Sequence, residues 1–195
     1  MPSQALIIFV KNPIEGQVKT RIAKTVGHAK AVEIYRELLQ YTHDVAETLP
    51  AADYAKTVYY GDFINDDDLW NGWQKALQPQ GGDLGNRMKQ AFREQFALGA
   101  ERVVIIGSDC LDLKPHHLQE AFQQLQRRDV VLGPSTDGGY YLLGMNVLYE
   151  PIFNDMPWSQ SELMEKTRAV LAQNNITYAL LEPLIDIDEW GDYNK

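Results

Sequence analysis

The chain has 195 residues, of which 45% are hydrophobic and 23% charged, as in soluble globular proteins, and we expect a single domain over residues 1–195. Its 27 acidic residues outnumber its 18 basic ones, and the net charge of −9 argues against a nucleic-acid partner, which would need a basic face. The lone cysteine, Cys110, excludes an internal disulfide. No apolar run approaches the roughly 20 residues of a membrane span, and no signal peptide is recognisable, so a cytoplasmic location is expected.

Strand-like and helix-like segments alternate along the chain, which predicts an α/β fold with a mainly parallel sheet. In chain order, the expected strands cover residues 5–10, 57–60, 102–106, 130–132, 140–145 and 178–181. The expected helices cover about 29–48, 66–75, 84–96, 115–125 and 162–173. Asn174 and Asn175 are suited to end the last helix in a left-handed turn. Ligands of such sheets gather beyond the carboxyl ends of the strands, so the loops 11–21, 107–113, 133–139 and 182–192 are the candidate functional segments.

The loop that follows the first strand concentrates positive charge in an acidic protein. Lys11, Lys19 and Arg21 can each neutralise a phosphate oxygen, and Gly16 allows the backbone to approach a ligand. The loop has neither the glycine spacing of a Rossmann fingerprint nor that of a P-loop. Taken alone, the loop fits a solvated surface loop as well as it fits a phosphate-binding loop.

Asp109 directly follows the most strongly predicted strand, so its carboxylate should face the crevice. Oxygen ligands of this kind suit a hard cation such as Mg²⁺ or Mn²⁺. The alternative is that Asp109 or Asp112 caps the helix that begins near Pro115, and Asp112 fits that role, or a turn, better.

The segment 133–139 ends in Asp137, Gly138 and Gly139, which permit a close backbone approach to a ligand. Asp137 can accept hydrogen bonds from hydroxyl groups of a sugar or an acceptor. An Asp-Gly pair is also a strong hairpin signal, and the two interpretations are compatible.

Asp186 and Asp188 alternate in the acidic segment near the C-terminus, so an extended backbone places both on the same side. Either carboxylate can share a cation with Asp109, and the ion would remove the repulsion of about 4 kcal/mol between two carboxylates ~4 Å apart. A solvated acidic tail is the alternative.

Several other residues are expected to be structural. Cys110 has no histidine placed to activate it as a nucleophile. His116 and His117 are expected in the first turn of a helix rather than in a metal site. Trp158 is the best candidate among the tryptophans for a pocket wall.

Taken together, these motifs resemble the bacterial glycosyltransferase A-like family, formerly domain of unknown function 2064 and also known as selenodomain-associated transferase 1. The similar segments are 9–21, 82–88, 107–110, 133–144 and 186–188. They occur in order over nearly the whole chain, which makes the set far more specific than any one motif. This family is assigned to the nucleotide-diphospho-sugar transferase superfamily, which also contains guanylyltransferases.

The resemblance implies a three-layer α/β/α sandwich of the GT-A type and a transferase that acts on a nucleotide or nucleotide-sugar with Mg²⁺ or Mn²⁺. It implies that Lys11, Lys19 and Arg21 face nucleotide phosphates and that Arg87 lies near phosphate or base. Asp109 and Asp188 match metal-binding carboxylates, with Asp186 as the alternative to Asp188. Lys19, Asp109 and Asp137 are the expected catalytic residues.

Two departures from the pattern bear on the reaction. Leu111 stands where a family member usually has proline. The superfamily's guanylyltransferases often open with a glycine-rich loop that this chain lacks, so glycosyl transfer to an unidentified acceptor is the leading expectation. Nucleotidyl transfer with release of pyrophosphate and a non-catalytic nucleotide-binding module are the alternatives.

Overall fold

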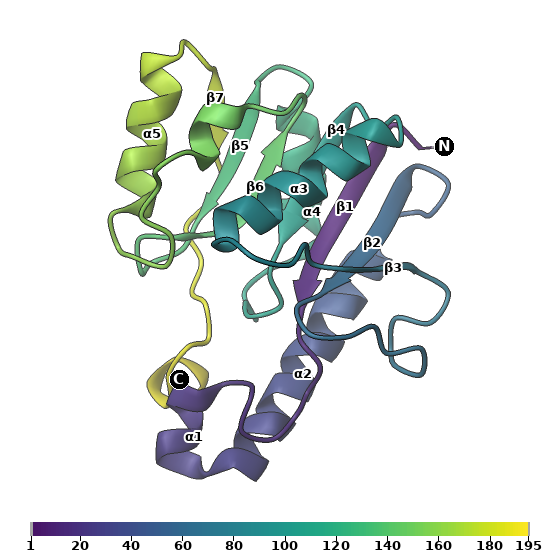
Figure 1. Ribbon diagram of the computed structural model, residues 1–195, viewed down its shortest axis with the longest axis vertical. Coiled ribbons are helices and arrows are strands. Elements are labelled where there is room, and N and C mark those ends of the chain that lie inside the picture. Colours follow the sequence, from purple (N-terminus) through teal and green to yellow (C-terminus); the bar gives the residue numbers. More distant parts are fainter. Residues whose placement is uncertain (1, 195) are drawn as a thin grey trace.

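The computed structural model describes residues 2–194, which form a seven-stranded sheet with helices on both faces (Figure 1). The strand order is β3-β2-β1-β4-β6-β5-β7. The strands are β1 (Gln4–Val10), β2 (Tyr54–Tyr60), β3 (Gln74–Leu77), β4 (Arg102–Ile106), β5 (Val130–Pro134), β6 (Tyr140–Met145) and β7 (Tyr178–Leu180). The α/β fold predicted from the sequence is therefore confirmed.

All strands of the sheet run parallel except β6, which is antiparallel to both of its neighbours. The central strands β1 and β4 pair directly, although almost a hundred residues separate them in the chain. Parallel pairing brings their carboxyl ends to the same edge, so the loops beginning at Lys11 and Gly107 leave the sheet side by side. The connection from β5 to β6 is the hairpin that the Asp-Gly signal indicated.

Two hydrophobic clusters cover the two faces of the sheet. One face packs against α2 (His28–Glu47) and α4 (Pro115–Gln124), and the other against α3 (Leu84–Ala97), α5 (Leu163–Gln173) and the 3-10 helix η1 (Glu150–Phe153). Alternate residues of β1 divide between the clusters: Leu6 and Ile8 face α2, whereas Ala5 and Ile7 face α3. The three layers of the predicted sandwich are present.

Two short helices were not predicted from the sequence. They are α1 (Thr20–Val26) and α6 (Trp190–Tyr193), which contact each other although they lie near opposite ends of the chain (Figure 1). The C-terminal segment therefore returns to the N-terminal loop. The backbone N–H of Ile187 donates to the carbonyl of Asp109 at 2.7 Å, which fixes this segment against the loop after β4.

The predicted helix over 66–75 is wrong. The segment forms turns and then enters β3, and Gly72 has a φ of 86° that a helix does not allow. Trp70 is buried and Lys75 donates to Asp68 at 2.8 Å, so tertiary contacts rather than helical periodicity organise it. The left-handed turn after α5 is confirmed, because Asn175 has a φ of 54°.

No helix within residues 2–194 combines the length and hydropathy needed to cross a lipid bilayer.

Candidate active site

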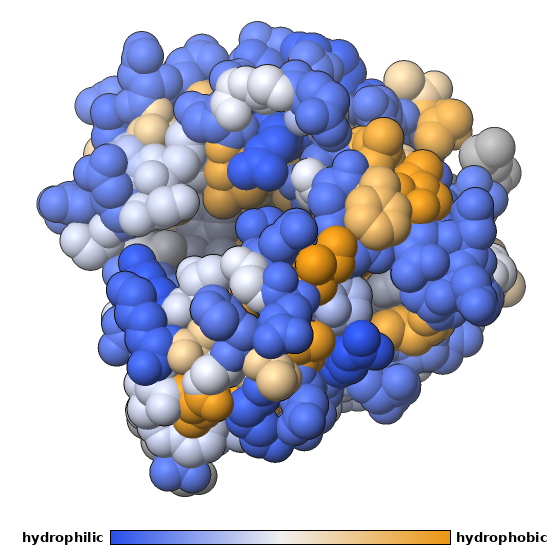
Figure 2. Space-filling model, turned by 60° about the horizontal axis from the view of Figure 1, so that its bottom comes forward, coloured by the Kyte–Doolittle hydropathy of each residue, from blue (hydrophilic) through white to orange (hydrophobic). Residues whose placement is uncertain are grey.

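A cavity of about 540 Å³ lies beyond the carboxyl ends of β1 and β4. Figure 2 views this end of the molecule, where the surface is hollowed between largely hydrophilic regions. All four candidate loops contribute side chains to the cavity, among them Lys11, Lys19, Asp109, Asp137 and Asp188. Side chains up to 177 positions apart in the sequence therefore line the same cavity. They meet there because all four loops leave the sheet at this edge.

The cationic loop places Lys11, Lys19 and Arg21 on the cavity wall. Gly16 has a φ of 80° and forms part of the turn, but it does not line the cavity. Lys19 stands directly before α1 with a φ of 46° and a ψ of 44°, a left-handed conformation that is uncommon for a residue with a side chain. Such outliers gather at functional sites because the surrounding structure must hold them.

The Lys19 ammonium group is almost fully buried and lies among oxygen atoms. Its Nζ is 2.7 Å from Asp109 Oδ1 and donates to the carbonyl of Ile187 at 2.6 Å. Asp188 Oδ1 lies 3.9 Å from the same nitrogen. Arg21 approaches the other oxygen of Asp188 at 3.9 Å but is mostly exposed, so this second contact is weak.

Asp186 also lines the cavity, with Asp188 two residues further along the chain. Burial raises the pKa of Asp186 from its usual 3.8 to about 7, and the neighbouring charges of Asp109, Asp137 and Asp188 add to the shift. Burial likewise raises the pKa of Asp188, although the adjacent Lys19 opposes it. Four carboxylates thus face the cavity, and among the residues that line it only Lys19 has a buried ammonium group. The excess of negative charge is suited to a divalent cation.

Asp137 sits at the tip of the β5–β6 hairpin and faces the cavity. One carboxylate oxygen accepts hydrogen bonds from the Ser135 hydroxyl and from the Gly139 N–H, the latter at 3.0 Å. Gly138 has a φ of 93°, and a Cβ there would lie 2.0 Å from the carbonyl oxygen of Ser161, so only glycine fits. The hairpin is therefore both a tight turn and a cavity wall, as the sequence allowed.

The other half of the cavity is apolar and lies between the sheet and α3. Phe9, Ile105, Met88 and Trp158 contribute to it. The Trp158 indole packs directly against Gly85, where a Cβ would come within 2.2 Å of the ring. The expectation that Trp158 forms a pocket wall matches its position.

Arg87 also lines the cavity, and its guanidinium donates to the buried Gln78 amide oxygen at 2.9 Å. Gln78 in turn donates to the carbonyl of Tyr59 at 3.2 Å, at the end of β2. Arg87 is thus held at the border between the apolar and the charged halves of the cavity.

Two residues that sequence reasoning missed connect the loops of the site. The Tyr35 hydroxyl, from α2, accepts from the Lys11 N–H at 3.0 Å and shares a hydrogen bond of 3.2 Å with the Ser108 hydroxyl. Asn12 is buried, and its N–H and side-chain amide both donate to the Asp62 carboxylate, at 3.1 and 2.8 Å. The Tyr35 bonds hold the cationic loop against the Asp109 loop, and the Asn12 bonds hold it against the segment after β2.

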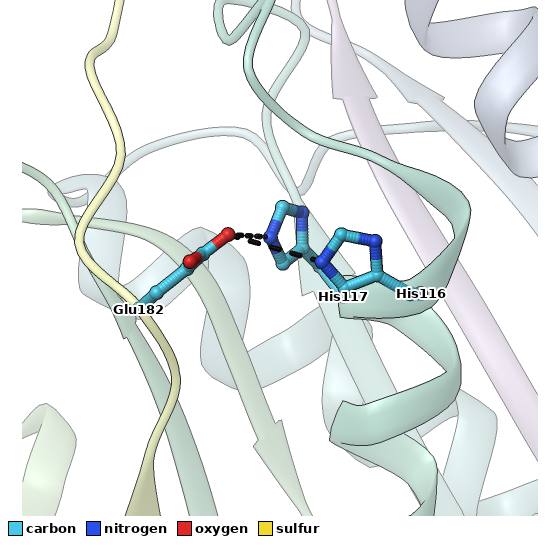
Figure 3. A group of neighbouring side chains, drawn as sticks. All are labelled: His116, His117 and Glu182. Carbon is cyan, nitrogen blue, oxygen red and sulfur yellow. Dashed lines mark hydrogen bonds and ion pairs between the residues drawn. The ribbon is translucent and has the colours of Figure 1, made fainter.

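A second group of titratable side chains lies outside the cavity lining. His116 and His117, in the first turn of α4 as expected, approach Glu182 from the segment after β7 (Figure 3). Their ligand atoms lie within 4.8 Å of one another, which is close enough to hold a metal ion. However, His117 Nδ1 accepts from the Lys114 N–H at 2.8 Å, which places the ring proton on Nε2, where it is donated to Glu182. His117 therefore caps the helix, and its remaining nitrogen has no lone pair for a metal. The N-cap is Lys114 rather than Asp112, which lies in the preceding turn.

Comparison with known proteins identifies the family. Residues 25–160 match the model of the family described as "Uncharacterized protein conserved in bacteria (DUF2064)". The chain belongs to this family. A solved structure from Desulfovibrio desulfuricans G20, provisionally assigned as a nucleotide-diphospho-sugar transferase, superposes with a TM-score of 0.89 and 32% identity over 100% of this chain and 86% of that one.

A 2-phospho-L-lactate guanylyltransferase of Methanocaldococcus vulcanius is 27% identical over 143 residues. The match takes in 71% of this chain but only 59% of that enzyme's length. The structure of a CMP:2-keto-3-deoxy-manno-octonic acid synthetase complexed with CTP is similar in fold, with a TM-score of 0.59 and 12% identity over 94% of this chain and 93% of that one. These comparisons confirm the fold of a nucleotide-diphospho-sugar transferase.

Proposed function

We propose that the protein is a metal-dependent nucleotidyltransferase that transfers a nucleoside monophosphate from a nucleoside triphosphate to a small acceptor and releases pyrophosphate. The observation that carries the proposal is the convergence of Lys11, Lys19 and Arg21 with Asp109 and Asp188 on one cavity. The guanylyltransferase relative supports the choice of nucleotidyl transfer over the glycosyl transfer that sequence motifs favoured.

The cationic loop is suited to hold the triphosphate. Lys11 and Arg21 are exposed on the cavity wall, where they can neutralise phosphate oxygens, and Arg21 can do so with two parallel hydrogen bonds. The reaction forms a bond between the acceptor oxygen and the α-phosphorus while the bond from that phosphorus to the bridging β-oxygen breaks. Negative charge then gathers on the leaving pyrophosphate, and fixed cations that face it stabilise this charge more than they stabilise the bound substrate.

Asp109 and Asp188 would hold the divalent ion, with Asp186 as a further oxygen donor in the same wall. Their oxygen ligands and their excess of negative charge fit Mg²⁺ or Mn²⁺ rather than a softer metal. When bound, the ion would draw electron density from the phosphates and screen the carboxylates from one another. The four carboxylates alone would repel a polyphosphate, so the proposal requires the cation.

The apolar half of the cavity would receive the nucleobase, and Asp137, which lines the same cavity, would orient an acceptor hydroxyl. A second candidate function is glycosyl transfer from a nucleotide-sugar, which the relative from Desulfovibrio desulfuricans favours. In that reaction the leaving group is a nucleoside diphosphate rather than pyrophosphate. The two functions would use the same cations and carboxylates.

Product analysis separates these functions. The protein is incubated with Mn²⁺, an acceptor panel of hydroxy acids, sugars and their phosphates, and either each nucleoside triphosphate or each nucleotide-sugar. Pyrophosphate release that depends on one acceptor is the expected result, whereas nucleoside diphosphate release from a nucleotide-sugar would replace the proposal with glycosyl transfer. Tight nucleotide binding without either product across the panel would contradict both reactions and identify a binding module.

A further inference from the structure

Lys19 lies where a cation bound by the acidic wall would also have to lie. Its ammonium nitrogen is 2.7 Å from Asp109 Oδ1 and 3.9 Å from Asp188 Oδ1, and it donates to the Ile187 carbonyl at 2.6 Å. These oxygens come from the two segments that the proposed function assigns to the metal. The ammonium thus offsets part of the negative charge that would otherwise attract a divalent ion.

The position of Lys19 is set by more than one contact. Its side chain is only 7% exposed, and its backbone is held in the left-handed region at the start of α1. Arg21, in contrast, has a side chain that is 66% exposed and approaches Asp188 only at 3.9 Å. Of the two cations next to the carboxylates, Lys19 therefore occupies the space between them, whereas Arg21 stays outside it.

An ammonium group and a divalent ion cannot share Asp109 without strong repulsion, because both charges are positive and the site is partly shielded from water. Lys19 must leave Asp109 before an ion can bind there. Lys19 also lines the cavity in which the phosphates would lie, so bound phosphates would offer it a second group of anionic oxygens.

We propose that Lys19 is the built-in counter-ion of the metal site and that the ion enters together with the phosphates of the nucleotide, not before them. The ligand of the nucleotide-free protein is then a preformed metal–polyphosphate complex: the ion takes the carboxylates of Asp109 and Asp188, while Lys19 moves onto the phosphates. The proposal rests on the proposed function for the place of the metal, but it concerns binding alone and needs no turnover.

The first test measures Mn²⁺ binding to the nucleotide-free protein by electron paramagnetic resonance, which reports free Mn²⁺. Lys19→Met and Lys19→Gln both remove the ammonium and keep much of the side chain's volume, so two variants guard against a folding defect in one. We expect each to bind Mn²⁺ at least tenfold more tightly than the wild type. Lys24→Met is the matched control, because Lys24 is an exposed residue of the same helix that does not line the cavity; it should change affinity less than twofold.

A double variant locates the ion. Adding Asp109→Asn to Lys19→Met should abolish the gain in Mn²⁺ affinity. If Lys19→Met and Lys19→Gln fold but bind Mn²⁺ no more tightly than the wild type does, or if the double variant keeps the gain, Lys19 is not the counter-ion of this site and the proposal is overturned.

The second test uses inorganic tripolyphosphate as a probe that is independent of the nucleobase. Water proton relaxation rises when Mn²⁺ becomes bound to a protein, so it reports the ternary complex. The wild type should show the rise only after tripolyphosphate is added to Mn²⁺, whereas Lys19→Met should show most of it with Mn²⁺ alone. A full rise in the wild type without tripolyphosphate would contradict the proposal, even if pyrophosphate-releasing activity were found.

Discussion

Two groups of titratable side chains among residues 2–194 differ in charge balance and in how closely their ligand atoms lie, because only the second of them brings three possible metal ligands within 4.8 Å of one another. The cavity group consists of Lys19, Asp109, Asp186 and Asp188, in which three carboxylates face one buried ammonium. The helix-cap group consists of His116, His117 and Glu182. In the cavity group burial and like charges raise the pKa of two aspartates, whereas in the helix-cap group hydrogen bonding to His117 lowers the pKa of Glu182.

The comparison teaches that proximity of ligand atoms does not make a functional site. In the helix-cap group the buried histidine has a partner on both ring nitrogens, and the arrangement stabilises the start of α4. In the cavity group the carboxylates remain unfavourable for one another until a ligand arrives. Perturbed ionisation of this kind in a cavity is typical of functional sites, because folding energy is given up there for binding.

The largest effect is expected from Asp109→Asn, which keeps the shape of the side chain but removes the charge that would bind the ion. Turnover in the product assay should fall by about 10²–10³-fold, as when one charge-stabilising group is lost from an active site. The matched variant Glu182→Gln removes a carboxylate from the helix-cap group and should leave turnover within twofold. An equal loss of turnover in Asp109→Asn and Glu182→Gln would show that the cavity group matters no more for catalysis than the helix-cap group does.

Asp186→Asn is expected to stabilise the metal-free protein at neutral pH. The pKa of Asp186 is about 7 in the folded protein instead of 3.8. Between pH 3.8 and about 7, Asp186 therefore keeps its proton in the folded protein but has lost it in the unfolded chain. Stability therefore falls as the pH rises through this window, by at most about 4 kcal/mol from this group.

Chemical denaturation with a chelator present, at pH 4.5 and at pH 7.5, measures this contribution. The difference in unfolding free energy between Asp186→Asn and the wild type should be small at pH 4.5 and large at pH 7.5. The exposed Asp112→Asn serves as the control and should give no such difference. A difference for Asp186→Asn that is the same at both values would contradict the account of its ionisation.

His117→Phe tests the structural role of the helix-cap group. The substitution keeps a buried ring but leaves the Lys114 N–H without its acceptor, which should cost about 1–3 kcal/mol of unfolding free energy. Thermal unfolding measures the loss, while Mn²⁺ binding should be unchanged. A variant that loses Mn²⁺ binding but not stability would show instead that this group holds a metal.

Arg21→Met should give the smallest effect. Arg21 is exposed and its contact with Asp188 is long, so the fold should not depend on it. Its loss should weaken nucleotide binding about tenfold, the equivalent of one charge-assisted contact of ~1.4 kcal/mol. Calorimetric titration with a nucleoside triphosphate gives the affinity, and Lys24→Met is again the control. An unchanged affinity would remove Arg21 from the phosphate site.

The sequence was sufficient for the parts of the fold that depend on local patterns. The buried strands β1 and β4 are continuous apolar runs, and α2 and α3 show helical periodicity. The short helices α1 and α6 are only 7 and 4 residues long, too short to show a helical pattern, and α1 packs against α2 as well as against α6. The segment 66–75 misled because its acidic start resembles a helix N-terminus, while burial of Trp70 decides its structure.

The candidate site was partly visible in the sequence. Placing each loop at the carboxyl end of a strand was enough to expect Lys11, Asp109, Asp137 and Asp188 in one cavity. The connecting residues were not visible, because Tyr35 and Ser108 are 73 positions apart and Asn12 and Asp62 are 50 apart. Nor does any local pattern reveal that Lys19 lies on Asp109, a contact that depends on the left-handed turn before α1.

The most direct test of the central claim is anomalous diffraction at the manganese edge from crystals grown with Mn²⁺ and the nucleoside triphosphate that stabilises the protein most. We expect a single strong peak within coordination distance of Asp109 and Asp188, with the triphosphate in contact with Lys11 and Arg21. A manganese peak at His116, His117 and Glu182, or a triphosphate bound away from the cationic loop, would contradict the account.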